Sequence, residues 1–361
     1  MALGAAVTIG IGATVQVVAP GPALIVLLDS GVFAEGSEFS GDSSLYVAVD
    51  YEASEQLSRE PGAGSVFEMV LEGTPEITLG VLGEIFSVEG EPSTSEYFSP
   101  EWPGYSLGSE DWSGPSIVLT WNGSGSWYYT DPAAYPEPIC EEVPAPEGSG
   151  KPPGFECVPA VADLPLPSEA EAREMAWEKL TAAGLEAERS DINILTNDEW
   201  GIGVSVASKV GGEPTALEWT MFWAPGPVLA SASGHSASAI NRGEFETLSP
   251  FDTVERLASG SWWGAPAIDY DHLDEDFHAH DGPLVQDGPQ ESTLTISAAT
   301  STSLLVWDSE GGQWIVPGYF LSFGEDEWER TAVISLGEDV LRIEAPASLE
   351  PEPGVDDARR K

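Results

Sequence analysis

The stretch "LEWTMFWAPGPVLASASG", residues 217–234, decides the fold class. Large apolar residues occupy every second position of its first half, at 217, 219, 221 and 223. A period of two is typical of a strand that buries one face and exposes the other. Ile202, Val204 and Val206 follow the same period in the preceding segment. The sequence therefore predicts antiparallel strands from about residue 201 onward.

A helix is predicted immediately upstream, over "SEAEAREMAWEKLTAAG". Ser168 followed three residues later by Glu171 is the pattern of a capping box, and Gly184 is a typical residue beyond the last helical turn. Between them, one apolar stripe is formed by Ala172, Met175, Ala176 and Leu180. Two further helix starts, each a hydroxyl residue followed by proline, occur at Thr74 and Ser249.

Two more hairpins are predicted from turn residues. "SIVLTWNGSGSWYY" turns at Asn122-Gly123, and "SLLVWDSEGGQWIVPGYFLSF" turns at Gly311-Gly312. Together with the helices they predict an α+β fold. It consists of repeated modules, each a short helix packed on antiparallel sheet, and ends in a C-terminal β-hairpin block.

Composition shifts and Pro/Gly-rich stretches divide the chain into seven segments. The predicted segments are an apolar export or anchor segment at 1–30, a first α+β module at 31–138, a Pro-rich cysteine-bearing linker at 139–167, a second α+β module at 168–265, an acidic His-containing linker at 266–291, a C-terminal β block at 292–345 and a polar tail at 346–361.

The amino end favours export. Residues 2–28 contain no ionisable side chain, and a run of this length is sufficient to cross a bilayer core as a helix. The basic residues that normally precede such a segment are missing, because the first one is Arg59. Two alternatives remain: translation begins upstream of Met1, or these residues are buried strands of the fold.

The charge balance restricts the partners. Thirteen basic residues against 61 acidic ones give a formal net charge of −48, which repels nucleic-acid phosphates. Cys140 and Cys157 are the chain's two cysteines, and both lie in the Pro-rich linker. They are predicted to form one disulfide, in keeping with an exported protein, although a pair of unrelated free thiols is the alternative.

The candidate metal site lies in "DYDHLDEDFHAHD", residues 269–281. Imidazole and carboxylate are ligands that zinc, nickel or copper accept, and the stretch offers both. The candidate ligands are His272, His278, His280, Asp274 and Asp276. Six carboxylates in thirteen residues also suit a solvated acidic loop. We therefore expect weak collection of divalent cations rather than a preorganised centre, and no dedicated cofactor.

Other chemistry has less support. "GHSAS", residues 234–238, approaches the nucleophile elbow G-x-S-x-G but lacks its last glycine and a helix directly after Ser236. The chain contains 13 tryptophans, and exposed indoles can stack on sugars. The adjacent Trp262 and Trp263 are the candidate ligand-binding residues, because at most one of them points inward if that stretch is extended. No catalytic residue is assigned.

Residues 165–345 resemble the PepSY-type modules of exported or membrane-anchored bacterial envelope proteins. The resemblance is carried by "SEAEAREMAWEKLTAAGL", "GIGVSVASKV", "LEWTMFWAPGPVLASASG" and "FETLSPFDTVERLASG", and by the terminal hairpin. It implies a helix followed by a hairpin and an extracytoplasmic binding or regulatory role, sometimes restraint of a peptidase. It transfers no catalytic residue.

The expected function is therefore non-catalytic binding or regulation outside the cytoplasm. The N-terminal segment would tether the protein to the membrane, and an unidentified protein or peptide would be its partner. Carbohydrate binding and divalent-cation binding are alternatives, and a hydrolase is a more distant one.

Overall fold

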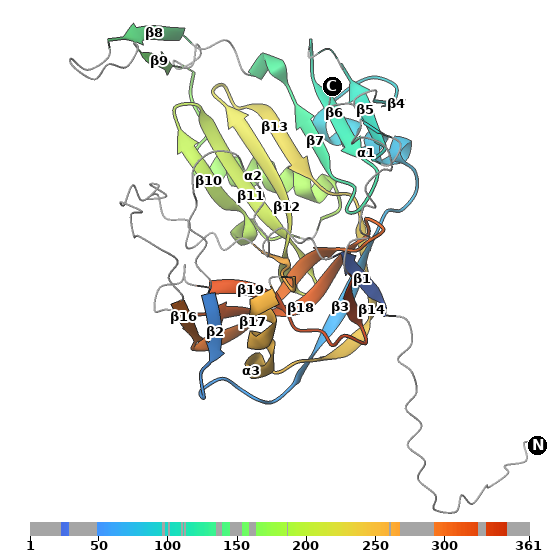
Figure 1. Ribbon diagram of the computed structural model, residues 1–361. Coiled ribbons are helices and arrows are strands. Elements are labelled where there is room, and N and C mark those ends of the chain that lie inside the picture. The colour runs from blue at the N-terminus through green and yellow to red at the C-terminus, as the bar shows by residue number, and fades with distance from the viewer. Residues whose placement is uncertain are drawn as a thin grey trace, which may run out of the picture.

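The computed structural model describes residues 23–28, 49–95, 98–99, 102–109, 111, 113–134, 139–144, 154–158, 164–185, 187–259, 261–267, 292–323 and 330–344. About half of them form strands, most of which lie in antiparallel sheets, and the helices are few and short. The fold is thus α+β with a strong bias toward β. In Figure 1 an eight-stranded sheet lies above a six-stranded sheet.

The eight-stranded sheet is built from two halves, each preceded by a helix. The first half comprises α1 (Pro75–Phe86), β4 (Ser93–Thr94), β5 (Gly104–Gly108), β6 (Ser116–Thr120) and β7 (Trp127–Thr130). The second comprises α2 (Glu169–Ala182), β10 (Asn193–Asp198), β11 (Gly201–Val210), β12 (Glu213–Ala224) and β13 (Val228–Gly234). The strand order is β10-β11-β12-β13-β7-β6-β5-β4, so the last strands of both halves pair in the middle.

The helix α2 begins and ends where the sequence predicts. The Ser168 hydroxyl accepts a hydrogen bond from the Glu171 N–H, and the Glu171 carboxylate accepts one from the Ser168 N–H, which completes the capping box. Gly184 follows with a left-handed φ of 77°. The buried residues Ala172, Ala176 and Leu180 pack against the sheet. This stripe attaches the helix to one sheet face.

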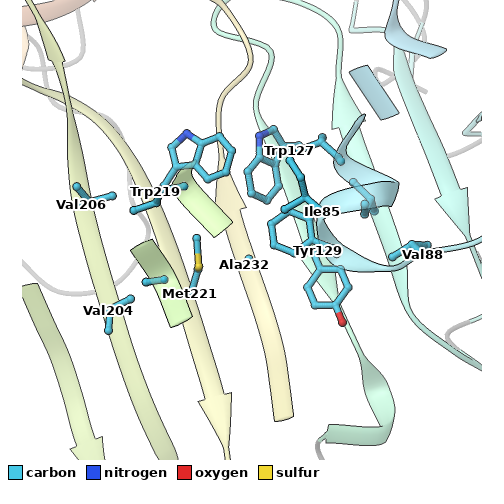
Figure 2. Packing of buried hydrophobic residues seen from close by; sticks show 14 of the residues in the cluster. Ile85, Val88, Trp127, Tyr129, Val204, Val206, Trp219, Met221 and Ala232 are labelled. Carbon is cyan, nitrogen blue, oxygen red and sulfur yellow. The ribbon is translucent and has the colours of Figure 1, made fainter. Parts of the chain in front are cut away.

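The core of the eight-stranded sheet lies under its two helices. Trp219 of β12 and Trp127 of β7 lie on either side of β13, with ring centroids 4.6 Å apart (Figure 2). Gly234 of β13 makes room for both, since a Cβ there would lie 2.6 Å from Trp127 and 2.8 Å from Trp219. The alternating residues of 217–223 thus bury their large side chains, as their period predicts.

The six-stranded sheet collects strands from distant parts of the chain. Its order is β14-β3-β18-β17-β15, with β19 also paired to β18. Its strands are β3 (Gly62–Val70), β14 (Ser238–Thr247), β15 (Ala265–Pro266), β17 (Ala298–Trp307), β18 (Gln313–Ser322) and β19 (Arg330–Ile334). The predicted hairpin at Gly311-Gly312 is β17 and β18. The C-terminal block therefore shares a sheet with strands from both predicted modules.

The expected export segment needs a correction at its end. Ile25–Leu28 form strand β1, which pairs in parallel with β20 (Leu341–Glu344). Ile25 is 1% exposed and Leu27 is 6% exposed, so these apolar residues are part of the folded core. No helix among the described residues has the length and apolarity to span a membrane.

Short pairs complete the structure. β2 (Val49–Ala53) pairs in parallel with β16 (Ser292–Ile296), and the helix α3 (Pro250–Thr253) starts after Ser249 as predicted. The 3-10 helices η1, η2 and η3 span Pro132–Ala134, Arg189–Asp191 and Val254–Ser259. Strands β8 (Ile139–Val143) and β9 (Gly154–Val158) form a hairpin inside the segment predicted as a linker.

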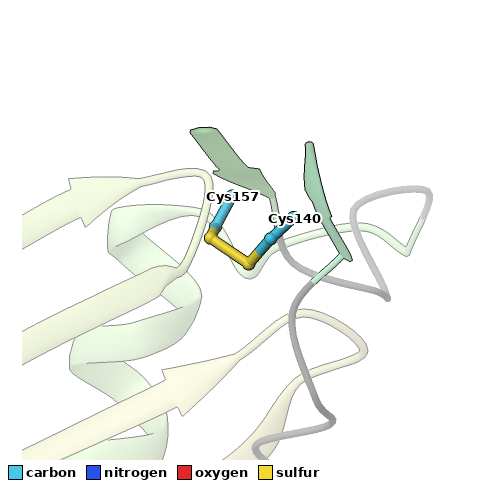
Figure 3. Close-up of a disulfide and its surroundings, with 2 residues drawn as sticks. All are labelled: Cys140 and Cys157. Carbon is cyan, nitrogen blue, oxygen red and sulfur yellow. A yellow bond between two sulfur atoms is a disulfide. The ribbon is translucent and has the colours of Figure 1, made fainter. Parts of the chain in front are cut away.

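Cys140 of β8 is bonded to Cys157 of β9, as predicted (Figure 3). The two cysteines face each other in the hairpin register, so the bond joins directly opposite positions. The hairpin lies at the end of the eight-stranded sheet that is far from the six-stranded sheet (Figure 1). The disulfide therefore closes a local loop rather than joining the two sheets.

Candidate functional site

A pocket of about 380 Å³ opens where the two sheets meet. We call it the junction pocket. Its floor belongs to the six-stranded sheet, and the turn between β11 and β12 reaches down to it from the other sheet. The lining residues are Gly62–Ser65 and Phe67 of β3, Val210, Gly211 and Glu213 at the turn, Thr247, Ser301–Ser303 of β17, Pro317–Tyr319 of β18 and Ser335.

The pocket exists because β18 changes partners at Pro317. Its pairing with β3 covers only Gln313 to Ile315, and its pairing with β19 begins at Gly318. Pro317 has no N–H to continue the first ladder. Its carbonyl instead accepts hydrogen bonds from the backbone N–H and the hydroxyl of Ser335, at 3.1 and 3.0 Å. The change of partner leaves a fork between β3 and β19.

Small residues keep the floor of the fork open. A Cβ at Gly64 would lie 2.5 Å from the Pro317 ring, so only glycine allows β3 to run this close to β18. Ser301 and Ser303 stand opposite Tyr319 and Pro317 on the neighbouring strand and add hydroxyls instead of bulk. The result is a hollow in a surface that larger side chains would fill.

The chemistry of the junction pocket is polar and nearly uncharged. Six lining residues are Ser or Thr and come from four different strands or their ends, while Glu213 is the one carboxylate among the lining residues. This composition is unusual for a chain with 61 acidic residues. Tyr319 adds an aromatic ring, whose hydroxyl donates to the Leu248 carbonyl at 3.1 Å. Such a surface suits hydrogen bonding to an uncharged polar ligand.

The predicted ligand-binding tryptophans lie elsewhere. Trp262 lines a second pocket of about 210 Å³, which we call the Trp262 pocket. The Trp262 ring packs partly against the core, and Trp263 is 51% exposed. Ser261 and Trp262 lie in a turn, and Trp263 directly after it is the more exposed of the two tryptophans. The other lining residues are Ser259, Ser261, Glu338, Arg342 and Ile343.

Arg256 holds Trp262 in place. Its guanidinium lies 3.6 Å from the centre of the indole ring, and its Nη1 donates to the Ile334 carbonyl at 2.8 Å. The Trp262 carbonyl accepts from the Ile334 N–H at 2.8 Å, so the same residue of β19 anchors both side chains. Burial lowers the pKa of Arg256 to about 10.

The predicted metal ligands cannot be placed. His272, His278, His280, Asp274 and Asp276 lie outside the described residues. Within the part of the chain that the structure does describe, no group of three or more His, Cys, Asp or Glu side chains is arranged to hold a metal ion.

The serine of "GHSAS" lies between two strands. Ser236 follows β13 and precedes β14, and its hydroxyl donates to the Gly125 carbonyl at 3.0 Å. A nucleophile elbow requires a helix directly after the serine, so this arrangement does not provide one. The neighbouring His235 directs its Nε2 to the Ser208 hydroxyl at 2.6 Å, and burial lowers its pKa to about 4.

The comparisons with known proteins assign no family. No family model and no curated protein matches this chain. A crystal structure of an uncharacterized protein from Eubacterium rectale is similar over 79% of this chain and 86% of that protein, with 10% sequence identity and a TM-score of 0.36. This similarity is too distant to indicate a function.

Sequence reasoning missed the junction pocket completely. Its residues come from four strands, from the turn between β11 and β12 and from the residue after β19, and they lie between positions 62 and 335 of the chain. Glycine and serine at these positions have many ordinary explanations in a sequence with 39 glycines. Pro317 was the one available signal, since proline inside a strand pattern marks an interrupted ladder.

Proposed function

We propose that this protein is a non-catalytic binding or regulatory protein that acts outside the cytoplasm, tethered at the cell envelope. Its partner is a protein or peptide, or a small ligand taken into the junction pocket. The observation that carries the proposal is the pocket itself: a hollow at the joint of two sheets, lined by hydroxyls and glycines and by a single carboxylate.

Three further features support the proposal. The Cys140–Cys157 disulfide is typical of proteins from oxidising compartments. The apolar residues upstream of β1 have the composition of an export segment. The order of α2 and the strands that follow agrees with the helix and hairpin expected of a PepSY-like module. Each of them favours an envelope protein without identifying its partner.

The single carboxylate at the junction pocket argues for an uncharged ligand. Glu213 is exposed at the rim, so it does not impose a charge on the floor. A cation would be attracted to many other places on a chain of net charge −48, and an anion would be repelled by the overall field. A neutral saccharide or a short uncharged peptide is neither attracted to other acidic sites nor repelled by the overall field. It can form hydrogen bonds with the hydroxyls of the pocket.

Calorimetric titration with neutral mono- and disaccharides and with N-acetyl-trialanine amide, whose capped termini carry no charge, tests this proposal. Ser301→Trp should fill the pocket and weaken binding at least about tenfold, because an indole on this strand projects over the floor. Thr300→Trp is the matched control, since Thr300 is also exposed but its side chain projects from the other face of β17. Equal binding by both variants would reject the junction pocket.

Carbohydrate binding through tryptophan is the second candidate. It is favoured by one observation: Trp262 lines a pocket, and the adjacent Trp263 exposes half of its side chain. A sugar that stacks on Trp263 should lose affinity in Trp263→Ala but not in Ser301→Trp. The divalent-cation alternative rests on residues 269–281 and is tested by titrating zinc into wild type and a His278→Ala, His280→Ala double variant.

A further inference from the structure

The Trp262 pocket differs from its surroundings in charge. Arg342 lines it, and Arg256 lies against the indole that forms part of its wall. Glu338 is the one carboxylate among the lining residues. Two guanidinium groups near one pocket reverse, locally, the balance of a chain that has 61 acidic and 13 basic residues.

Neither arginine forms an ion pair within the described part of the chain, although Glu338 lies close enough for its charge to act on Arg256. The ion pairs found there involve Arg173, Arg189, Lys209 and Arg242. Arg342 is exposed on β20 and has no hydrogen bond to another described residue. Its exposed side chain lines the pocket and carries five N–H donors.

Arg256 is the more unusual of the two. Its guanidinium is largely buried, and its contacts are an indole face and one backbone carbonyl. These contacts use one N–H of the group, and no carboxylate of the described residues forms an ion pair with it, because Glu338 acts only at longer range. Partly desolvated charge next to a pocket raises the attraction for an anion well above that of an exposed arginine.

The geometry points to a binding site for a small ligand that carries an oxyanion, namely a carboxylate, phosphate or sulfate group. We propose that Arg342 contacts the oxyanion and that Arg256 supplies a second positive charge from behind the Trp262 ring. The hydroxyls of Ser259 and Ser261 line the same pocket but donate to the carbonyls of Arg256 and Ser259, at 2.8 and 3.2 Å, so the arginines provide the donors for the oxyanion. The indole offers an apolar face to the rest of the molecule.

This site is independent of the proposed function. The Trp262 pocket and the junction pocket share no lining residue, and their ligands differ in charge. A neutral sugar on Trp263 would require neither arginine. The anionic ligand is therefore a separate assignment, and a test can separate it from both earlier candidates.

Calorimetric titration of the full chain with sulfate, phosphate and glucuronate at constant ionic strength tests the proposal, with glucose as the neutral comparison. We expect saturable binding of at least one anion, weakened about tenfold or more in Arg342→Gln. Arg173→Gln is the control, because it removes the same charge from an exposed helix position on the other sheet. Ser301→Trp should bind the anion normally.

Arg256→Gln provides the second variant, and its melting temperature shows whether it folds. It should weaken anion binding while Arg342 is intact. The proposal is overturned if no anion binds, if Arg173→Gln weakens binding as much as Arg342→Gln does, or if glucose binds as tightly as glucuronate. The last result would instead assign the pocket to neutral sugars.

Discussion

At the scale of single residues, His235 is the most informative position. It lies where the chain leaves the eight-stranded sheet for the six-stranded one, and its ring is hydrogen-bonded to Ser208 at 2.6 Å. Its Nδ1 is buried without a hydrogen-bond partner among the described residues. A neutral imidazole fits this place, whereas an imidazolium would place an uncompensated charge between the sheets.

The pKa of His235 therefore predicts a pH dependence of stability. Burial holds the folded-state pKa at about 4, below the ordinary value of 6.5. The unfolded chain thus binds the proton first as the pH falls, so the free energy of unfolding decreases from about pH 6.5 to about pH 4, by up to about 3 kcal/mol. Urea unfolding at several pH values measures this decrease.

His235→Gln is the control for that measurement. Glutamine keeps a group that can bond to Ser208 but does not titrate, so the part of the pH dependence that belongs to His235 should disappear. The many carboxylates titrate equally in both proteins. Identical pH profiles for wild type and variant would show that the imidazole is not held in its neutral form.

At the scale of elements, the capping box of α2 is a local feature with a predictable effect. Ser168→Ala removes the hydroxyl that accepts from the Glu171 N–H, and should lower the free energy of unfolding by about 1 kcal/mol. Thr181→Ala changes an exposed residue of the same helix and should be neutral or slightly stabilising. Denaturant titration of both variants compares the two effects, and equal effects would argue against the cap.

Loss of the disulfide between β8 and β9 should have little effect on the stability of the two sheets. Among the described residues β8 and β9 pair only with each other, and Phe155 of β9 is 72% exposed. Replacing both Cys140 and Cys157 by serine should therefore leave the unfolding midpoint of the two sheets nearly unchanged, well short of the 2–5 kcal/mol loss seen in small disulfide-stapled domains. A large fall in the midpoint would mean that this hairpin supports the core.

Local elements are also what the sequence predicts best. The capping box, the alternation at 217–223 and the turn before Gln313 are encoded within a few residues, and the structure contains each of them. The turn after Thr120 is wider than predicted, because the Gly125 N–H bonds to the Asn122 carbonyl and the loop extends to Ser126. Short polar loops carry too little information to fix their length.

At the scale of the whole molecule, the decisive contacts join distant residues. β3 pairs with β14 about 175 residues later and with β18 still further along the chain. Strand edges are chemically alike, so a sequence pattern shows that a strand exists but not which strand it pairs with. For this reason the sequence pattern assigns the residues of β1 to an export segment. It also does not predict that strands from different modules share a sheet.

The junction pocket is formed by these long-range pairings, and the proposed function rests on that pocket. It forms only when β3, β17 and β18 are aligned beneath the turn that follows Val210. The Trp262 pocket also joins distant parts of the chain, because residues 259–262 meet residues 338–343 there. The sequence singles out Trp262 and Trp263 as candidate residues, but the pocket, like the junction pocket, requires the assembled fold.

The most direct test of the central claim is thiol protection at the junction pocket. The chain has two cysteines and both are in the disulfide, so Ser301→Cys introduces a single free thiol on the pocket floor. The rate of its reaction with a maleimide is measured with and without neutral disaccharides or N-acetyl-trialanine amide. We predict that at least one of them slows labelling at 301 and leaves Thr300→Cys, on the other face of β17, unaffected. Unchanged rates at 301 with every probe, or equal slowing at both positions, would contradict the claim.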